Sequence, residues 1–217
     1  MLTTSGDGTA HIWQCAVSLH NESSSGRVAS SEDELEFCEM EQYSDTENTS
    51  SQIPTLRTPL QTLTGHTGVV ISGDWLSGGE QVITGGWDRL ATIWDAHSGQ
   101  CVQQLAGHDD ELTYCATHPS QRLVVTASKD STFRLWDFRE TIHAVSVFQG
   151  HQESVSSAVF VHNTDLIVSG SDDRSIKVLG CKWDFGERKV GPKIKLGQET
   201  TIFHKNTITT LGTNKWG

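Results

Sequence analysis

The sequence repeats a short signature at a nearly constant interval. The dipeptide Gly-His occurs at Gly65-His66, Gly107-His108 and Gly150-His151, so the intervals are 42 and 43 residues. A period of this length is typical of repeat architectures, in which each repeat is one supersecondary unit that packs on its neighbours. No other feature constrains the possible folds as strongly.

Further residue types keep fixed positions within each repeat. An aromatic or aliphatic residue lies 28 residues after the histidine, an aspartate six residues before that position, and a hydroxyl residue four residues earlier still. The opening residues supply the second half of one more unit at the same offsets. The recurring residues are Thr3, Asp7, Trp13, His66, Thr84, Asp88, Trp94, His108, Thr126, Asp130, Trp136, His151, Ser169, Asp173 and Leu179.

Short runs rich in β-branched residues alternate with Gly, Asp, Ser and Asn turns, and no helical periodicity of useful length appears. The chain is therefore predicted to be all-β. Fourteen strands are expected, near 2–5, 9–15, 59–64, 68–75, 81–85, 91–95, 101–105, 112–118, 123–128, 132–137, 143–148, 154–160, 165–171 and 174–179.

Gly-His followed by Trp-Asp at this spacing resembles the WD-repeat β-propellers, in which each unit contributes four antiparallel strands to a blade around a central channel. The resemblance implies a partial propeller of about three to four four-stranded blades from a parent of about seven. Blade one lacks its first strand, and blade four lacks a convincing last strand. The expected parts are the end of a first repeat (1–15), an acidic disordered insert (16–58), the WD repeats (59–180) and an atypical, irregular or disordered tail (181–217).

The insert carries most of the chain's negative charge. The segment from Gln14 to Leu60 holds nine acidic residues against two basic ones, which is −7 of the net −11. Its Ser- and Thr-rich composition is typical of disorder, expected over about 18–55. Ser30, Ser31 and Ser44 each have an acidic residue three positions later and are candidate phosphorylation sites for a regulated docking strip. A plain solubilising linker is the alternative.

The recurring histidine, aspartate, hydroxyl and tryptophan are expected to meet within each blade. Hydrogen bonds running from the Trp N–H through the hydroxyl and the His to the Asp would satisfy buried polar groups and staple the blade. The same residue types make up a hydrolytic triad. Because the set recurs with the repeat, and its hydroxyl belongs on a buried strand, we predict a structural role and no catalytic residue.

Candidate interaction residues surround the turn aspartates. Trp87 precedes Asp88 and is a candidate anchor for a protein partner, or alternatively packs against the adjacent blade. Matching positions in the next blades, and the positions after the aspartates, predict a polar interaction face, with an ordinary solvated rim as the alternative. These positions hold Lys129, Asp172, Arg89 and Arg174.

The sequence Trp136-Asp137-Phe138-Arg139 has the form W-D-x-R. Some propellers of this family use that form to dock onto the adaptor of cullin-4 ubiquitin ligases, with the arginine making charge-assisted contacts. Trp136 and Asp137 belong to the repeat in any case, so only Arg139 carries this interpretation.

The last repeat departs from its pattern. Leu179 and Gly180 stand where Trp and Asp are expected, yet Trp183-Asp184 follows four residues later. The departure indicates either a splice-choice or gene-model artefact of four residues, or a local bulge. An open arc with missing end strands would also leave unpaired strand edges, so the chain alone is expected to be marginally stable or insoluble.

Composition excludes several classes of function. The pI near 5.3 argues against a nucleic-acid surface, and no apolar run approaches the length of a membrane span. Five scattered cysteines form no zinc or disulfide pattern, the histidines form no ligand-like cluster, and no phosphate-binding glycine motif is present. We therefore expect no cofactor, no metal, no membrane insertion and no small-molecule substrate.

The expected function is that of a non-enzymatic scaffold for protein partners. With no signal-like segment at its start, the chain is expected to be intracellular, and the resemblance implies the cytoplasm and also the nucleus. The resemblance further implies an adaptor that works with phosphofurin acidic cluster sorting proteins. The alternatives are a substrate receptor of a cullin-4 ligase and a non-functional truncated product.

Overall fold

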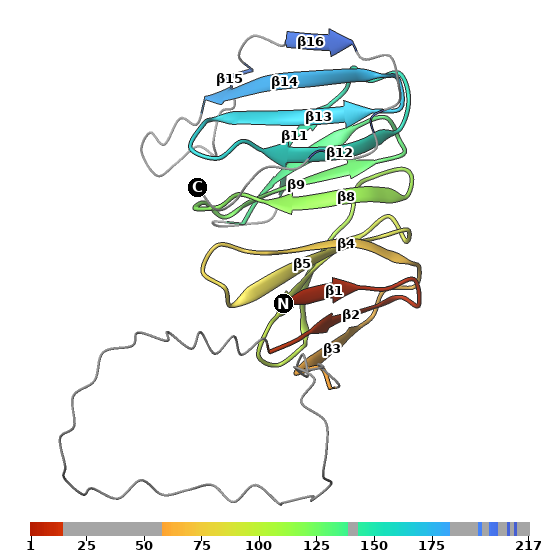
Figure 1. The fold of residues 1–217 in the computed structure, drawn as a ribbon, viewed down its shortest axis with the longest axis vertical. Helices are drawn as coiled ribbons and strands as arrows, with labels where there is room; N and C mark the ends of the chain where they lie inside the picture. Colours follow the sequence, from red (N-terminus) through yellow and green to blue (C-terminus); the bar gives the residue numbers. More distant parts are fainter. Residues whose placement is uncertain are drawn as a thin grey trace, which may run out of the picture. The chain divides into compact units, whose positions relative to one another are not determined.

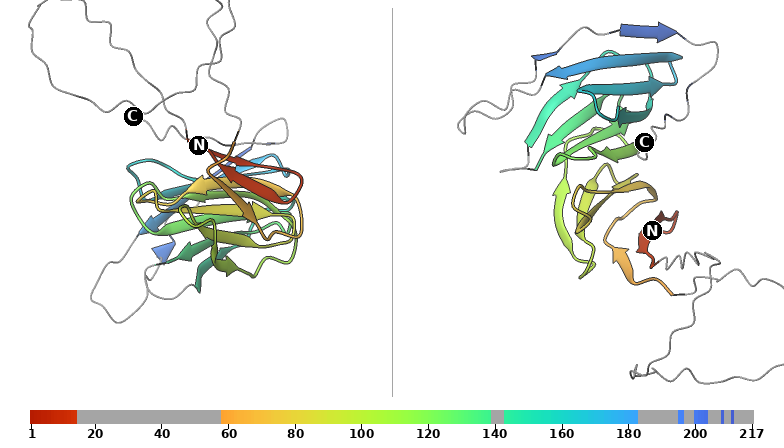
Figure 2. Two further views of the ribbon diagram at one scale, coloured as in Figure 1. Left: turned by 90° about the horizontal axis from the view of Figure 1, so that it is seen from below. Right: turned by 60° about the vertical axis from the view of Figure 1, so that its left-hand side comes forward.

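The computed structural model describes residues 1–14, 58–138, 143–182, 195–196, 200–203, 208 and 211. Every regular element in these residues is a β-strand, and the strands form four antiparallel sheets. Figures 1 and 2 show the sheets following one another in chain order. Nowhere in the described ranges is there a helix long and apolar enough to cross a membrane.

Each sheet corresponds to one expected blade. Blade one has the order β1-β2-β3, blade two β4-β5-β6-β7 and blade three β8-β9-β10-β11, while in blade four β14 pairs on its far side with β16 and, at its end, with β15. The strands are β1 (Leu2–Thr4), β2 (Thr9–Ile12), β3 (Gln61–Thr64), β4 (Val70–Trp75), β5 (Gln81–Gly86), β6 (Ala91–Asp95), β7 (Cys101–Leu105), β8 (Leu112–Thr117), β9 (Leu123–Ser128), β10 (Phe133–Asp137), β11 (His143–Phe148), β12 (Val155–Phe160), β13 (Leu166–Ser171), β14 (Ser175–Lys182), β15 (Lys195–Leu196) and β16 (Thr200–Phe203).

The hydrophobic core lies between neighbouring blades. One cluster joins blades two and three through residues such as Ile83, Leu105, Leu112 and Val124, and similar clusters join blades one and two and blades three and four. The second strand of each complete blade is covered on both faces, which is why its sequence reads as a continuous β-branched run rather than an alternating one. A single sheet could not bury these side chains alone.

Polar contacts also join the first strands of adjacent blades. A bulge in β4, β8 and β12 leaves Ile71, Thr113 and Ser156 outside the regular pairing. The Thr113 hydroxyl donates to the carbonyl of Val155 in the next blade at 2.5 Å. Likewise, the backbone N–H of Cys115 donates to the Ser72 hydroxyl oxygen at 2.9 Å. Hydrogen bonds as well as packing therefore fix the alignment of adjacent blades.

The prediction of an all-β, partial WD-repeat propeller is confirmed, and each of the fourteen expected strands has a counterpart. The expected absence of a last strand in blade four is wrong, because β16 pairs with β14 from Ser175↔Phe203 to Val178↔Thr200. This strand is short and without alternating polarity, so no sequence pattern predicted it. Pairing satisfies backbone groups that would otherwise form an open edge on β14.

The bulge considered at Leu179 is not present. The pairing of β13 with β14 continues without a shift through Ile167↔Leu179 and Leu166↔Gly180. Leu179 therefore takes the register position that Trp94 and Trp136 hold in the preceding blades, and it is buried there. The acidic insert and its three candidate serines lie outside the described residues.

The contact between blades one and two generates a prediction. A Cβ on Gly73 would lie 2.9 Å from the Leu2 side chain and 3.1 Å from both the Ile83 carbonyl oxygen and the Thr4 side chain. Gly73→Ala should therefore overpack this interface and lower the free energy of unfolding by about 1–3 kcal/mol. Urea unfolding of the variant and the parent chain measures the difference.

Gly6→Ala is the matched control, because no atom lies within 4 Å of the Cβ that would be added there. It should change stability by less than about 0.5 kcal/mol. Equal losses in the two variants would contradict the packing argument.

Candidate functional site

One edge of the blades collects the loops that hold the candidate residues. We call it the turn face; it lies along the right-hand edge of Figure 1. It comprises the loops that precede the first strands and the turns that join the second and third strands. The loops are 65–69, 106–111 and 149–154, and the turns are 5–8, 87–90, 129–132 and 172–174.

Below this face, the recurring polar residues of blade two form a continuous hydrogen-bond network. His66 Nδ1 lies 2.7 Å from Asp88 Oδ2, and His66 Nε2 lies 2.7 Å from Thr84 Oγ1. The Trp94 indole N–H donates to the same hydroxyl at 2.7 Å. We call this arrangement the repeat network.

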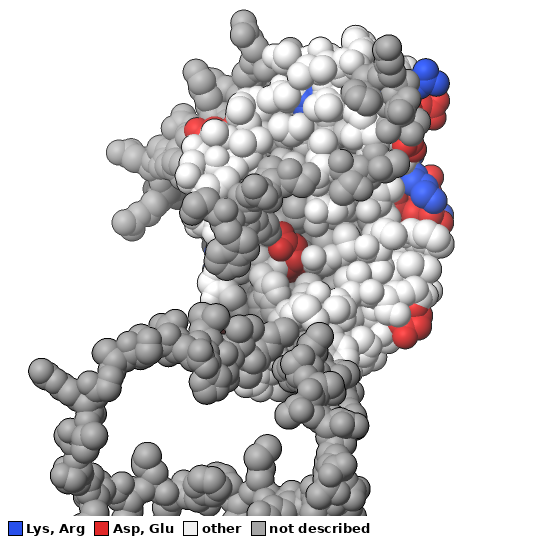
Figure 3. All heavy atoms as spheres, in the orientation of Figure 1, with Lys and Arg blue, Asp and Glu red and all other residues white. Residues whose placement is uncertain are grey.

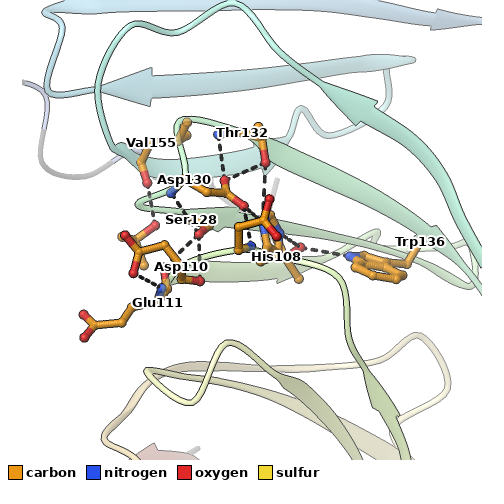
Figure 4. Close-up of polar contacts among 11 residues, drawn as sticks. His108, Asp110, Glu111, Ser128, Asp130, Thr132, Trp136 and Val155 are labelled. Atoms are coloured by element: carbon orange, nitrogen blue, oxygen red, sulfur yellow. Dashed lines mark hydrogen bonds and ion pairs between the residues drawn. The ribbon is translucent and has the colours of Figure 1, made fainter.

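Blade three repeats this geometry (Figure 4). The His108–Asp130 and His108–Thr126 contacts are both 2.8 Å, and Trp136 donates to Thr126 at 2.9 Å. The corresponding distances therefore agree within 0.2 Å between the two blades.

The outer blades hold shorter versions. In blade four His151 contacts Asp173 at 3.0 Å and Ser169 at 2.8 Å, and the indole donor is missing because the Leu179 side chain has no N–H. In blade one Trp13 donates to Thr3 at 2.8 Å, while Asp7 accepts from the backbone and hydroxyl of Thr9.

The network has one consistent direction in blades two and three. The aspartate carboxylate can only accept, so the histidine Nδ1 carries the ring proton and donates it. Nε2 of the neutral ring then accepts the threonine hydroxyl proton, and the threonine oxygen accepts the indole N–H. This order assigns the Nδ1–H tautomer to His66 and His108.

The aspartate joins two loops of the turn face. In blade three, Asp130 Oδ2 accepts the backbone N–H of Asp109 as well as the His108 bond. Its Oδ1 accepts the backbone N–H and hydroxyl of Thr132 at 2.9 and 2.6 Å. The residue between them, Ser131, has a φ of 64°, in the left-handed region. One carboxylate therefore fixes both a loop and a tight turn.

Glycine is required before the histidine for a steric reason. Gly65 has a φ of +150°, and a Cβ added there would lie 3.1 Å from the ring of Trp94. The loop therefore passes directly over the indole, which explains the Gly-His signature in blade two. At Gly107 the added Cβ would instead approach the Arg134 guanidinium at 2.5 Å.

Burial and hydrogen bonding shift the pKa values of the histidine and the aspartates in the network. Burial lowers the pKa of His108, and this outweighs the opposite effect of Asp130. For Asp130, burial alone would raise the pKa, but the hydrogen bonds from Thr132 and His108 prevail and lower it. The pKa of Asp173 is likewise lowered, because the bonds from Ser175, Gln152 and His151 outweigh the effect of burial. The folded state thus favours a neutral histidine and an ionised aspartate.

This geometry does not suit a hydrolytic triad. The hydroxyl residues Thr84, Thr126 and Ser169 are all 0% exposed, so no substrate could reach their oxygens. In blades two and three the hydroxyl is also occupied by the indole N–H. The arrangement staples the blade, in the sense that it satisfies buried polar groups and orders two loops at once.

The residue before each turn aspartate projects from the turn face. The backbone N–H groups of Trp87, Lys129 and Asp172 donate to loop carbonyls at matching positions, those of Val69, Glu111 and Ser154, at 2.9–3.0 Å. All three projecting residues are exposed, and the Trp87 side chain is left 42% accessible. The structure therefore has features of both interpretations of Trp87, because its side chain is 42% exposed while its ring contacts Lys129 of the adjacent blade.

Trp87 and Lys129 meet across the boundary of two blades. Lys129 Nζ lies 5.2 Å from the centre of the Trp87 ring and 2.5 Å from Glu111 Oε2. We call Trp87, Lys129 and Glu111 the anchor cluster. It combines an exposed aromatic surface with a cation–π contact and an ion pair.

The remaining candidates have different positions. Arg89, Asp172 and Arg174 are exposed on the turn face, and Figure 3 shows charged side chains gathered along that edge. No contact recorded for the described residues joins these three to the anchor cluster. Arg139 lies outside the described residues.

Two features were missed by the sequence analysis. The first is the hydroxyl two residues after the turn aspartate, in Thr132 and Ser175, which the recurring D-x-S/T pattern could have revealed. The second is a cavity of about 450 Å³. It is lined mostly by residues of the first strands of the blades, such as Asp74, Tyr114 and Phe160. This cavity exists only because neighbouring blades pack side by side, so no pattern in the sequence predicts it.

Within the described ranges, no cluster of three or more His, Cys, Asp or Glu residues could hold a metal ion.

Comparisons with known proteins agree with this architecture. Residues 57–95, 99–137 and 143–179 match the family described as "WD domain, G-beta repeat". Each matched segment spans the fourth strand of one blade and the first three strands of the next.

Individual relatives cover more of the chain. It is 51% identical over 187 residues to WD repeat-containing protein 37 of Mus musculus and 52% identical over 185 residues to that of Homo sapiens, across 84% of the chain but only 37% and 36% of those proteins. It is 31% identical over 122 residues to pre-mRNA-processing factor 19 of Mus musculus, across 56% of the chain and 23% of that protein. The chain therefore spans little more than a third of the length of the two WD repeat-containing protein 37 relatives.

The repeat network predicts a sharp contrast between two buried threonines. Thr126→Val should leave both the Trp136 N–H and the His108 Nε2 without a partner and lower the free energy of unfolding by about 1–3 kcal/mol. The control Thr92→Val removes a buried hydroxyl that has no partner, so it should be neutral or stabilising. Urea unfolding measures both, and equal losses would contradict a stapling role for Thr126.

The lowered pKa values predict how stability depends on pH. His108 titrates at a lower pH in the folded chain than its unfolded value of 6.5, so its contribution is complete above that pH and declines as the pH falls below it. Asp130 and Asp173 contribute fully above their unfolded value of 3.8, and that contribution is lost as the pH falls through their lower folded values. Stability should thus decline in two stages on acidification, as measured by urea unfolding between pH 8 and 2.

Asp130→Asn tests whether protonation of Asp130 contributes to the second stage of the decline in stability. The variant should be less stable at pH 7, and its stability should decline less than that of the parent chain below pH 4. Stability that is constant or rises as the pH falls from 7 to 3 would contradict the pKa shifts.

Proposed function

The chain belongs to the WD40 repeat family, and on that premise we propose that it is a non-enzymatic scaffold that binds a partner protein through its turn face. The observation that carries the proposal is the anchor cluster of Trp87, Lys129 and Glu111. Large aromatic residues and arginines contribute most of the binding energy in protein interfaces, whereas most surrounding contacts contribute little. Within the described loops and turns that define this face, Trp87 is the exposed aromatic residue.

The anchor is ordered before a partner arrives. The backbone of Trp87 is bonded to Val69, and its ring is covered on one side by Lys129, which is itself held by Glu111. A preordered side chain loses less conformational entropy on binding, so more of its contact energy appears as affinity. The contact across two blades also makes the anchor dependent on the correct packing of the propeller.

The surroundings of the anchor favour a protein as the ligand. Both signs of charge are exposed on the same face, in Asp109, Asp110, Glu153 and Asp172 and in Arg89 and Arg174. An aromatic centre with a charged, solvated periphery is typical of protein interfaces. The prevailing acidity favours a partner surface that carries some basic residues.

For the partner itself, we propose phosphofurin acidic cluster sorting proteins, on the resemblance stated from the sequence. The similarity to WD repeat-containing protein 37 supports testing this class first. We further propose that the chain acts in the cytoplasm and also in the nucleus. Fluorescence imaging of the tagged chain tests the location.

The proposed ligase role has narrower support. In the W-D-x-R segment, Trp136 belongs to the repeat network and Asp137 is buried, so both have structural reasons to be present. Only Arg139 bears on a cullin-4 adaptor. If Arg139→Ala abolished recovery of that adaptor from cells, the substrate-receptor function would replace the scaffold function proposed above.

Trp87→Ala tests the proposed function. Truncation of a central aromatic anchor should cost about 2 kcal/mol or more of binding free energy, which is about a 30-fold loss of affinity. The measurement is titration of the purified chain with a phosphofurin acidic cluster sorting protein, together with quantitative proximity labelling in cells.

The matched control is Val102→Ala, because Val102 is 53% exposed but lies on β7, away from the turn face. It should leave the affinity and the labelled proteins unchanged. Equal affinities of Trp87→Ala and the parent chain would exclude the turn face as the binding surface. Loss in both variants would indicate an effect on folding rather than on the anchor.

A further inference from the structure

The side of blade four that faces away from blade three is in contact with described residues from the C-terminal part of the chain. Two described residues of that part, Ile208 and Leu211, contact Ser156, Ser157 and Gly170 of blade four. Leu211 also packs on the core cluster shared by blades three and four. These contacts can be compared with those at the junctions between the other blades.

The first matched contact involves the bulged residue of the first strand. Between blades three and four, the Thr113 hydroxyl donates to the carbonyl of Val155, the first residue of β12. In blade four, the hydroxyl of the corresponding bulged residue, Ser156, donates to the carbonyl of Ile208. Ile208 thus takes the place that the first residue of a blade's first strand has at the other junction.

The second matched contact uses the residue after the bulge. Between blades two and three, the backbone N–H of Cys115 donates to the Ser72 hydroxyl oxygen at 2.9 Å. At the far side of blade four, the backbone N–H of Leu211 donates to the Ser157 hydroxyl oxygen at 2.9 Å. Cys115 is the fourth residue of β8, so Leu211 takes the fourth position.

The third matched contact is steric. A Cβ on Gly85 of blade two would meet the side chains of Leu112 and Cys115, the first and fourth residues of β8. A Cβ on the equivalent Gly170 would meet Ile208 and Leu211. Three independent contacts therefore give the same alignment.

The sequence agrees with this alignment. Ile208-Thr209-Thr210-Leu211-Gly212-Thr213 corresponds to Leu112-Thr113-Tyr114-Cys115-Ala116-Thr117 of β8. His204 precedes Ile208 by four residues, as His108 precedes Leu112. The strand β16 comes directly before this histidine, just as a fourth strand comes before the histidine of every other repeat.

We propose that the side face of blade four is a binding site for the first strand of a further repeat, and that this chain fills it with its own residues Ile208 and Leu211. The site selects an extended segment with aliphatic side chains at its first and fourth positions. Ser156 binds the carbonyl of the first position, and Ser157 binds the N–H of the fourth. His204 is the corresponding histidine of this further repeat.

The regular spacing of the repeats does not reveal this further repeat. His204 follows His151 by 53 residues rather than 42 or 43, and Phe203 stands where glycine precedes the other histidines. The family match also ends at residue 179. The contacts with blade four are independent of both the interval and the glycine, so only the structure brings the segment into register.

Gly170→Ala tests the site directly. Its methyl group would lie 2.6 Å from Ile208 Cγ2, which is a branch of a β-branched side chain and cannot simply rotate away. Hydrogen exchange of the Leu211 amide, followed by NMR in the full chain, reports the binding. In the parent chain this amide should be protected, and in Gly170→Ala its exchange should be at least tenfold faster.

Two further variants keep the result interpretable. Gly85→Ala is the matched control, since its methyl group would find no atom closer than 3.3 Å and blade three already has Ala127 at this position. Gly170→Ala combined with Ile208→Ala is the rescue, because the second change removes the atom that clashes. The rescue should restore most of the Leu211 protection, while the control should not change it.

The proposal is overturned if the Leu211 amide of the parent chain exchanges at the rate of an unstructured peptide. It is equally overturned if Gly170→Ala leaves that exchange unchanged, or if this variant unfolds as a whole and Ile208→Ala does not rescue it. None of these outcomes bears on Trp87, which lies on the turn face, so the proposed function is tested separately.

Discussion

The repeat network of tryptophan, hydroxyl, histidine and aspartate is the interaction on which the rest of the structure depends. In blade two its members come from two strands, a loop and a turn, and their side chains are buried, with the His66 and Asp88 side chains only 2% and 5% exposed. A buried donor or acceptor left without a partner there would lower the free energy of unfolding by about 1–3 kcal/mol. The complete network therefore stabilises blades two and three as units, while blades one and four form with shorter versions of it.

The turn face inherits its order from this network. The aspartate holds the loop and the turn together, and the residue that precedes it is thereby directed into solvent. In blade two that residue is Trp87, and the loop of the next blade supplies Glu111 to hold Lys129 over its ring. A buried structural network thus positions an exposed aromatic surface, the one proposed above to bind a partner protein.

Particular residues show how far the sequence could be followed. The fixed offsets among His108, Asp130, Thr126 and Trp136 predicted contacts that the structure contains, because these residues are set by one rigid repeat. Leu179 could not be resolved in the same way. A tryptophan replaced by leucine is compatible with a bulge or with an unchanged strand, and only the pairing with Ile167 decides between them.

The sequence by itself determined the repeat, the strands, the blade network and the positions of the turn residues, since all of these depend on contacts within one unit of about 42 residues. The tertiary structure decided what happens between units: the contact of Lys129 with Trp87, the fourth strand of blade four, and the place of Ile208 and Leu211. These contacts join segments whose separation along the chain is not fixed by the repeat. Their energy comes from burial and pairing across a boundary, which has no period in the sequence and is visible only when neighbouring blades are packed together.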